Sequence, residues 1–202
     1  IFGFLVARDA YDTAIMAPLF ILMSLSLGMA VFWVSTLTMC RWNGYRVSPE
    51  LSEKLRRLSA LFILGVLSLV ALHHLTNIYM AHHQGIERFL LVDGGVYPWL
   101  FWLGFVLCGG IVPVWWFLDR RFCTPAWTVT AALMVIVGGL CHLYVIIIGA
   151  QAYPLRLVSG YRVDSGLYDG DITHYLPTLP ELALGIGGVS LALLMTVLAV
   201  RI

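Results

Sequence analysis

Five long apolar runs dominate this sequence. They cover approximately residues 14–38, 58–81, 97–118, 127–149 and 181–200, and each contains at most one charged side chain. A helix needs about 20 mostly apolar residues to cross a bilayer, so each run is long enough to span one. Hydrophobic residues make up 60% of the chain and charged residues 11%, against roughly 45–50% and about 25% in soluble domains. The sequence therefore predicts an integral membrane protein.

The backbone of these runs must find its hydrogen-bond partners within the protein, because lipid offers none. A transmembrane barrel would show short strands of alternating polarity, whereas these runs are long and uninterrupted. We therefore expect an all-α integral membrane protein, a helical bundle of about five transmembrane helices in a single membrane domain over residues 1–202. The chain begins at Ile1 within an apolar stretch, and we expect it to be a fragment of a longer chain.

The connections between the runs differ in charge. Eight of the twelve Lys and Arg residues fall on one side: Arg41, Arg46, Lys54, Arg56, Arg57, Arg120, Arg121 and Arg201. The other side carries Arg8, Arg88, Arg156 and Arg162 together with most acidic residues, Glu87 among them. We expect a multi-pass protein of the cytoplasmic (inner) membrane, and the positive-inside rule predicts that the first side faces the cytoplasm. Loops 39–57 and 119–126 would then face the cytoplasm, and loop 150–180 the periplasm or exterior.

Polar side chains at membrane depth are candidates for function. They are His73 and Asn77 in the second run and His142 and Tyr144 in the fourth. At 1.5 Å per residue, His73 and His142 both lie about 22 Å from the cytoplasmic edge. His74 points about 100° away from His73, so at most one of the two is expected to face a given ligand.

Three interpretations of His73 and His142 are open. The two imidazoles could bind a haem b iron from opposite sides, with Gly65 and Gly138 leaving room for the macrocycle. They could instead hydrogen-bond a quinone carbonyl and exchange its protons. Finally, they could make interhelical hydrogen bonds alone.

Other motifs concern helix ends and packing. Ser48-Pro49-Glu50 predicts a helix start with Ser48 as the N-cap. Thr178-Leu179-Pro180-Glu181 is a capping-box pattern, which makes capping the favoured role of Glu181 and a proton relay the alternative. The pairs Gly109-Gly110 and Gly138-Gly139, and Gly185-Ile186-Gly187-Gly188, predict close helix packing.

The remaining composition excludes some classes of site. The four cysteines form no CxxC motif, so we expect no iron–sulfur cluster in this chain. The net charge of +1 gives no reason to expect a nucleic-acid partner.

Three stretches resemble the C-terminal half of the NrfD/PsrC (polysulfide-reductase-type) membrane subunits, most closely the DsrP-type subunits of sulfite-reductase-associated Dsr complexes. The first is Ala17-Pro18-Leu19-Phe20 leading to Gly28-Met29-Ala30, and the second is Tyr97-Pro98-Trp99-Leu100-Phe101-Trp102. The third is IIIGAQAYPLRLVSGY from Ile146, followed after a polar loop by YLPTLPELALGIGGVSLALL. Members of this family have about eight to ten spans, so five would form the second half.

The resemblance implies a function. Such subunits bind a membrane quinone, menaquinone or ubiquinone, and pair with an outward-facing iron–sulfur subunit of the four-cluster ferredoxin type. This chain would then pass electrons between the quinone pool and that partner within a respiratory or sulfur-metabolism complex. The quinone or proton candidates are His73, Asn77, His142, Tyr144 and Glu181. The docking candidates in the long outer loop are Tyr153, Tyr161, Tyr168 and Asp169. The alternatives are a b-type cytochrome with His73 and His142 as haem ligands, and a non-redox membrane anchor.

Overall fold

The computed structural model describes residues 9–154, 172, 175 and 177–201, which form helices and connecting turns without a strand. Within these residues the all-α prediction is confirmed. In the described part of the chain, five spans are long and apolar enough to cross a membrane: α1 (Met16–Asn43), α2 (Pro49–Tyr79), Val96–Leu118, Pro125–Ala152 and the first 20 residues of α8 (Leu179–Arg201). Each predicted apolar run falls on one of them. The chain is therefore a multi-pass integral membrane protein.

The third and fourth spans change their winding along their length. The third consists of α4 (Val96–Trp99), a π-helical stretch (Leu100–Ile111) and α5 (Val112–Leu118). The fourth consists of α6 (Pro125–Tyr144), a π-helical turn (Val145–Gly149) and α7 (Ala150–Ala152). A 3-10 turn (Arg120–Phe122) connects these two spans. A short α3 (Gln84–Arg88) and a π-helical turn (Phe89–Asp93) lie between α2 and α4.

Local sequence explains where α1 ends and α2 begins. Gly44 adopts the left-handed conformation (φ 72°), and its N–H donates to the Cys40 carbonyl, which closes α1 in the manner typical of a C-terminal glycine. Ser48 accepts a hydrogen bond from the Leu51 N–H, and Pro49 is the first residue of α2. The predicted N-cap is therefore confirmed, and residues 44–48 form a tight connection between the two helices.

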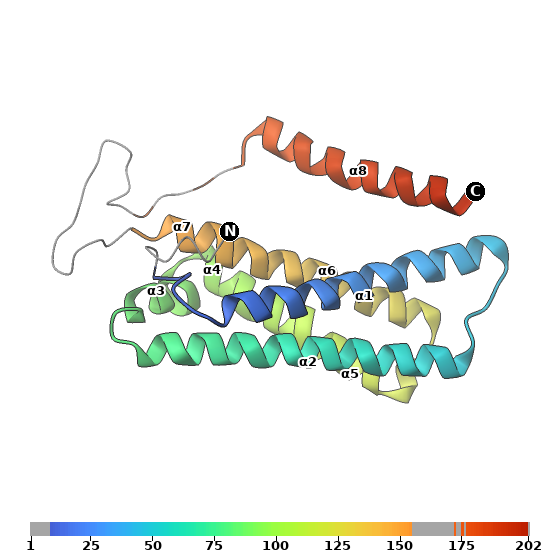
Figure 1. Ribbon diagram of the computed structural model, residues 1–202, viewed down its shortest axis with the longest axis horizontal. Coiled ribbons are helices and arrows are strands. Elements are labelled where there is room, and N and C mark those ends of the chain that lie inside the picture. The colour runs from blue at the N-terminus through green and yellow to red at the C-terminus, as the bar shows by residue number, and fades with distance from the viewer. Residues whose placement is uncertain (1–8, 155–171, 173–174, 176, 202) are drawn as a thin grey trace.

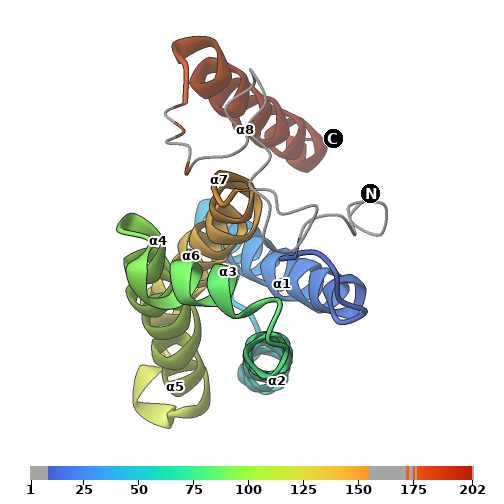
Figure 2. The same cartoon turned by 90° about the vertical axis from the view of Figure 1, so that its left-hand side faces the viewer.

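Four of the spans pack into one bundle. α1, α2 and α6 run side by side along its length, with α5 behind α2 (Figure 1). Residues 44–48 lie at one end of the bundle, here called the 44–48 end, and α3 crosses the opposite end, here called the α3 end (Figure 2). The indole of Trp33 in α1 donates to the Ser59 hydroxyl of α2 at 3.0 Å.

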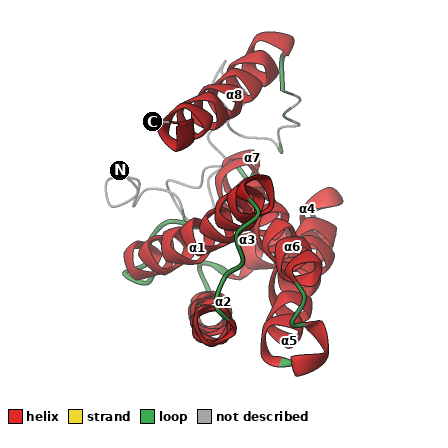
Figure 3. Ribbon diagram, turned by 90° about the vertical axis from the view of Figure 1, so that its right-hand side faces the viewer, coloured by secondary structure: helices red, strands yellow, loops and turns green. Residues whose placement is uncertain are grey.

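The α8 helix lies beside the bundle and apart from it (Figures 1 and 3). Its described side chains are exposed along nearly the whole helix. A Cβ atom added at Gly185, Gly187 or Gly188 would meet nothing within 4 Å. Within the described residues, these glycines therefore do not mediate the close packing that the sequence predicted for them.

The glycine pairs of the third and fourth spans do mediate close packing. A Cβ atom on Gly138 would lie 2.2 Å from the Cα of Gly109, and one on Gly139 would lie 2.6 Å from Leu27 Cδ2. The prediction of close packing for these pairs is confirmed. The accompanying idea that Gly138 leaves room for a macrocycle is wrong, because the backbone of Gly109 fills that space. At Gly65 the side chain of Leu22 does the same.

Arg56 is buried inside the 44–48 end, although the charge pattern placed it with the loop cations. Its guanidinium donates to the carbonyl oxygens of Trp116 and Asp119 and contacts the Cys123 sulfur. The last carbonyls of a helix lack partners within the helix, and here an arginine from α2 supplies donors to the end of α5. Arg56 thereby fixes α2 against α5.

Candidate functional site

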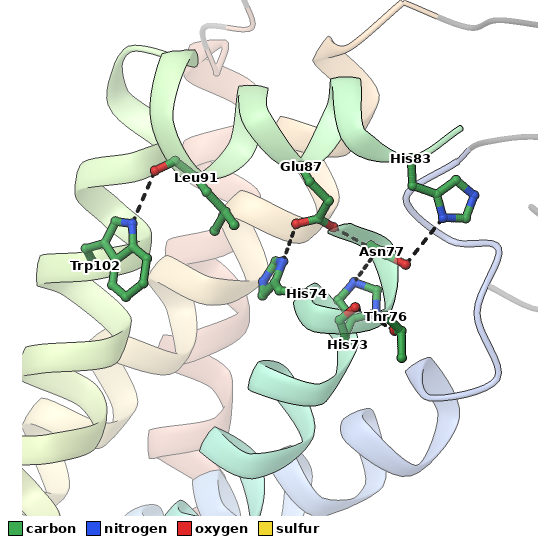
Figure 4. Close-up of polar contacts among 8 residues, drawn as sticks. All are labelled: His73, His74, Thr76, Asn77, His83, Glu87, Leu91 and Trp102. Carbon is green, nitrogen blue, oxygen red and sulfur yellow. Dashed lines mark hydrogen bonds and ion pairs between the residues drawn. The ribbon is translucent and has the colours of Figure 1, made fainter. Parts of the chain in front are cut away.

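A network of buried polar side chains lies at the α3 end, with Glu87 at its centre (Figure 4). Glu87 is only 2% exposed, and its side chain points from α3 toward the last turns of α2. Its Oε2 lies 2.6 Å from His74 Nδ1, and its Oε1 accepts a hydrogen bond from Asn77 Nδ2 at 2.7 Å. The carboxylate therefore connects α3 to two positions on α2.

Asn77 extends the network in two further directions. Its Nδ2 also lies 3.3 Å from His73 Nε2, and its Oδ1 lies 3.4 Å from His83 Nδ1. All of these side chains are buried. Nearer the surface, the Nε2 of the exposed His82 lies 3.2 Å from an oxygen of Asp9. The rings of His82 and His83 lie 5.7 Å apart, so polar side chains extend from the outside of the α3 end to the buried network.

His73 and His74 both belong to this network. Their ring centroids lie 5.1 Å apart, and their exposed fractions are 4% and 7%. Each ring has its own partner, since Glu87 contacts His74 and Asn77 contacts His73. The expectation that at most one of the two faces a given ligand stays a prediction.

His142 lies beyond this network, fully buried between aromatic rings. It stacks on Phe105, with ring centroids 4.1 Å apart and planes at 16°, and Phe101 lies 6.2 Å away. Phe101 also contacts His74, with their ring centroids 4.8 Å apart. Both ring nitrogens of His142 lack a hydrogen-bond partner in the described part of the chain. An aromatic wall from the third span therefore lies beside both His74 and His142.

A haem held between His73 and His142 does not fit this arrangement. Phe105 covers one face of the His142 ring. The space beside Gly138 is filled by Gly109, and His73 Nε2 is engaged with Asn77. The donor atoms are chemically suitable, but the groove that a flat macrocycle needs is closed.

A pocket of about 520 Å³ opens next to the network. It lies between the segment that precedes α1 and the last turn of α2, and it is lined by Tyr11, Asp12, Thr13, Ala14, Ile15, Thr76, Asn77 and Met80. The Tyr11 hydroxyl donates to the Ile146 carbonyl at 3.0 Å. This bond fixes the segment against the fourth span. Asn77 is thus shared between the pocket wall and the buried network.

A second pocket, of about 1040 Å³, lies at the 44–48 end. Aromatic and basic residues are prominent in its lining, which includes Trp33, Arg41, Trp42, Tyr45 and Arg46. None of the candidate residues named from the sequence lines it. The two pockets therefore differ in kind, since only the smaller one adjoins the buried carboxylate and histidines.

The other candidate residues lie elsewhere. Tyr144 is half-buried and stacks with Tyr97, with ring centroids 6.1 Å apart. Tyr153 packs against Phe89 at 5.6 Å. Glu181 Oε2 accepts hydrogen bonds from the Thr178 N–H and the Tyr175 hydroxyl, both at 2.7 Å, which is the predicted capping contact. Tyr161, Tyr168 and Asp169 lie outside the described residues.

Sequence reasoning missed Glu87 and His83 as site residues. The charge pattern placed Glu87 in an outer connection, whereas α3 folds back and buries Glu87 together with His83, the residue that precedes the helix. A signal was present in the apolar character of this connection, which includes Ile86, Phe89, Leu90, Leu91 and Val92. Such a segment is too hydrophobic to lie freely in water, and a carboxylate within it needs a buried partner.

Comparisons with known proteins agree with the membrane architecture. Residues 1–154 match the family described as "Polysulphide reductase, NrfD". The chain is also 26% identical over 211 residues to the "Hdr-like menaquinol oxidoreductase integral membrane subunit" of Archaeoglobus fulgidus. This alignment covers 100% of the chain and 52% of the relative, so the chain spans about half the length of the curated relative that it matches. No solved structure matches significantly.

Proposed function

Because this chain belongs to the NrfD polysulphide reductase family, we propose that it is a membrane subunit of a quinone-linked redox complex. It passes electrons between the quinone pool and an outward-facing iron–sulfur subunit of the four-cluster ferredoxin type. The name of the Archaeoglobus fulgidus relative, a menaquinol oxidoreductase subunit, supports a quinone and favours menaquinone. The family description favours a complex of sulfur metabolism.

The contact between the smaller pocket and the buried network carries this proposal. Oxidation of a quinol releases two electrons and two protons, so a quinol site needs proton acceptors within reach of the ring. Asn77 lines the pocket and donates to Glu87 at 2.7 Å. Glu87 in turn lies 2.6 Å from His74. In this pocket, only the Asn77 side chain would separate a quinol ring from the Glu87 carboxylate and the imidazoles of His73 and His74. Proton transfer to a side chain requires such proximity.

The larger pocket suits a quinone less well. It contains two arginines, and its described lining includes no histidine and no carboxylate. It can bind an apolar ring, but its lining provides no group that accepts a proton near neutral pH. The quinone is therefore assigned to the pocket beside Asn77, and Glu87 is added to the candidates His73 and Asn77 as the carboxylate that takes up its protons.

The two alternative functions have weaker support. The closed space beside Gly138 disfavours a b-type cytochrome with His73 and His142 as ligands. A passive anchor would have no need of a buried carboxylate bound to histidine and asparagine. Ionisable groups at membrane depth are costly and usually mark ion or substrate pathways.

The proposed orientation follows from the charges of the connections. The 44–48 end faces the cytoplasm, and the α3 end faces the periplasm or exterior of the inner membrane. The quinone pocket and loop 150–180 are then on the partner's side, where Tyr153, Tyr161, Tyr168 and Asp169 supply the docking surface. A photo-crosslinking residue at Tyr161 or Tyr168 should capture an iron–sulfur subunit. If neither position ever reaches such a subunit, the docking proposal is wrong.

Photolabelling of the intact complex with an azido-quinone tests the quinone site. We expect the label on residues 11–15, 76, 77 or 80, which line the smaller pocket. We also expect Asn77→Ala to slow quinol oxidation by about tenfold or more, because Glu87 loses its amide partner. Arg46→Gln, in the larger pocket, is the control and should leave turnover unchanged. A label on residues 40–49 together with normal turnover of Asn77→Ala would contradict the proposal.

A further inference from the structure

Three side chains of the buried network converge on one point. One ring nitrogen from each of His73 and His74 and one carboxylate oxygen of Glu87 lie within 4.8 Å of one another, and all three residues are buried. The imidazoles come from α2 and the carboxylate from α3 (Figure 4). We infer that His73, His74 and Glu87 form a binding site for a divalent transition metal ion, with Zn²⁺ as the best match.

The donor set determines which ions fit. Two imidazoles and one carboxylate are a recognised ligand set for Zn²⁺, which leaves a fourth position to water. Imidazole ligands also suit other late transition metals. Ca²⁺ and Mg²⁺ prefer oxygen ligands throughout, and the site offers them one carboxylate. The chemistry of the site therefore selects a transition metal over the abundant alkaline-earth ions.

The distances require only small side-chain movements. A tetrahedral ion with ligands at 2.0–2.1 Å holds its donor atoms about 3.4 Å apart. The three donors already lie within 4.8 Å. His74 Nδ1 and Glu87 Oε2, now 2.6 Å apart, would have to separate by about 1 Å if both became ligands. The backbones of α2 and α3 can stay in place, because the glutamate side chain has freedom to make this adjustment.

The surrounding hydrogen bonds favour ligation. Asn77 donates to the second oxygen of Glu87 and so orients the carboxylate, as outer-shell partners of metal sites do. His73 Nδ1 and His74 Nε2 are buried and lack a hydrogen-bond partner among the described residues. Buried polar atoms without partners are uncommon and call for an explanation. An ion bound through His73 Nδ1 would satisfy that nitrogen, whereas ligation through His74 Nδ1 would still leave His74 Nε2 in need of a partner.

Asn77, which donates to Glu87, also borders the pocket of about 520 Å³. This pocket is therefore an open space one side chain away from the proposed metal ligands. A bound ion would occupy the same His73, His74 and Glu87 groups that the proposed function uses for protons, so the metal-bound form and the proton-carrying form exclude each other.

Zinc binding to the purified, tag-free protein tests the inference. After chelator treatment, the protein should bind one Zn²⁺ per chain in competition with a chromophoric chelator. Glu87→Gln and His74→Ala should lower the affinity by about 100-fold or more, and Asn77→Ala by about 10- to 100-fold. His82→Ala removes a neighbouring histidine outside the set and should change nothing. Absence of stoichiometric binding, or equal affinity in all variants, overturns the inference.

A measurement on the unmodified protein keeps the test decisive if a variant fails to fold. X-ray absorption of the zinc-loaded protein should show two imidazoles and oxygen ligands, with Zn–N distances near 2.0–2.1 Å. Co²⁺ in place of Zn²⁺ should give the visible absorption of a tetrahedral site. A sulfur ligand in the spectrum would place the ion at a cysteine and refute this site.

Discussion

Gly109 and Gly138 meet back to back, so closely that a Cβ atom on Gly138 would lie 2.2 Å from the Cα of Gly109. Their contact holds the third span against the fourth, and these spans carry Phe105 and His142. The aromatic stack beside the buried network depends on this close approach. The contact lies backbone to backbone, so no flexible side chain can move aside to relieve a substitution.

We expect Gly138→Ala to destabilise the protein by about 1–3 kcal/mol, the usual range for overpacking a closely packed interface. Thermal unfolding in detergent measures the effect. Gly28→Ala is the matched control, because a Cβ atom at Gly28 would meet nothing within 4 Å. That change should be neutral or stabilising by up to about 1 kcal/mol, since alanine is the better helix former. Equal effects of the two substitutions would refute the packing argument.

Arg56 gives a second prediction for stability. Arg56→Met should destabilise the protein by about 1.5–3 kcal/mol, because the carbonyls of Trp116 and Asp119 lose a charged donor. Arg57→Met is the control. Arg57 pairs with Glu53 on the exposed face of α2, where an ion pair is worth less than about 1 kcal/mol. The unfolding temperatures of the two variants should therefore differ clearly, and indistinguishable values would show that Arg56 is not a structural residue.

For Glu87 we predict that its role in proton transfer can be separated from its role in structure. Glu87→Gln keeps a side chain that hydrogen-bonds His74 and Asn77 but cannot take up a proton near neutral pH. Quinol-linked turnover should fall by about 100-fold or more, while the unfolding temperature changes less than it does in Glu87→Ala. Normal turnover in Glu87→Gln would remove Glu87 from the proton route.

The hydrogen bond between Tyr175 and Glu181 predicts a change in titration. This bond to the carboxylate favours the neutral phenol and raises the pKa of Tyr175 above its ordinary value of 10.0. We expect Glu181→Ala to lower the pKa of Tyr175 toward 10. The ring carbon signals of labelled tyrosine, assigned with Tyr175→Phe, report the titration by NMR. If the titration is the same with and without Glu181, this contact does not persist in solution.

Orientation is tested by cysteine labelling in intact cells. In a cysteine-free background, an impermeant reagent should modify Asp93→Cys at the α3 end and leave Lys54→Cys unmodified. Both positions are exposed, so burial does not explain a difference. Labelling of Lys54→Cys alone would reverse the proposed topology.

Spans, caps and helix contacts could be predicted because they depend on local patterns. The apolar runs mark the helices, Ser48-Pro49 marks the start of α2, and Thr178 with Glu181 marks the start of α8. Gly138-Gly139 marks a close contact because only small residues let two membrane helices approach so nearly. None of these predictions required knowledge of which segments meet across the bundle.

The candidate site could be predicted only in part. His73, Asn77 and His142 stand out as polar residues within apolar runs. The position of Glu87 depends on α3 folding back over the end of α2, and the charge count of a connection does not predict such a fold. The burial of Arg56 at the other end of the bundle could not be predicted from the charge count either. A cation near a span boundary can point inward where the last carbonyls of a helix lack hydrogen-bond donors.

Glu87 is the one carboxyl group that the described part of the chain buries. A protonated carboxyl absorbs infrared light at a frequency that few other protein groups share. A difference spectrum between the oxidised and reduced complex should therefore contain at most one such band from these residues, and Glu87→Gln should abolish it. Because no other carboxyl group is buried among the described residues, the infrared band of Glu87 can be assigned to it and followed through turnover without an added label.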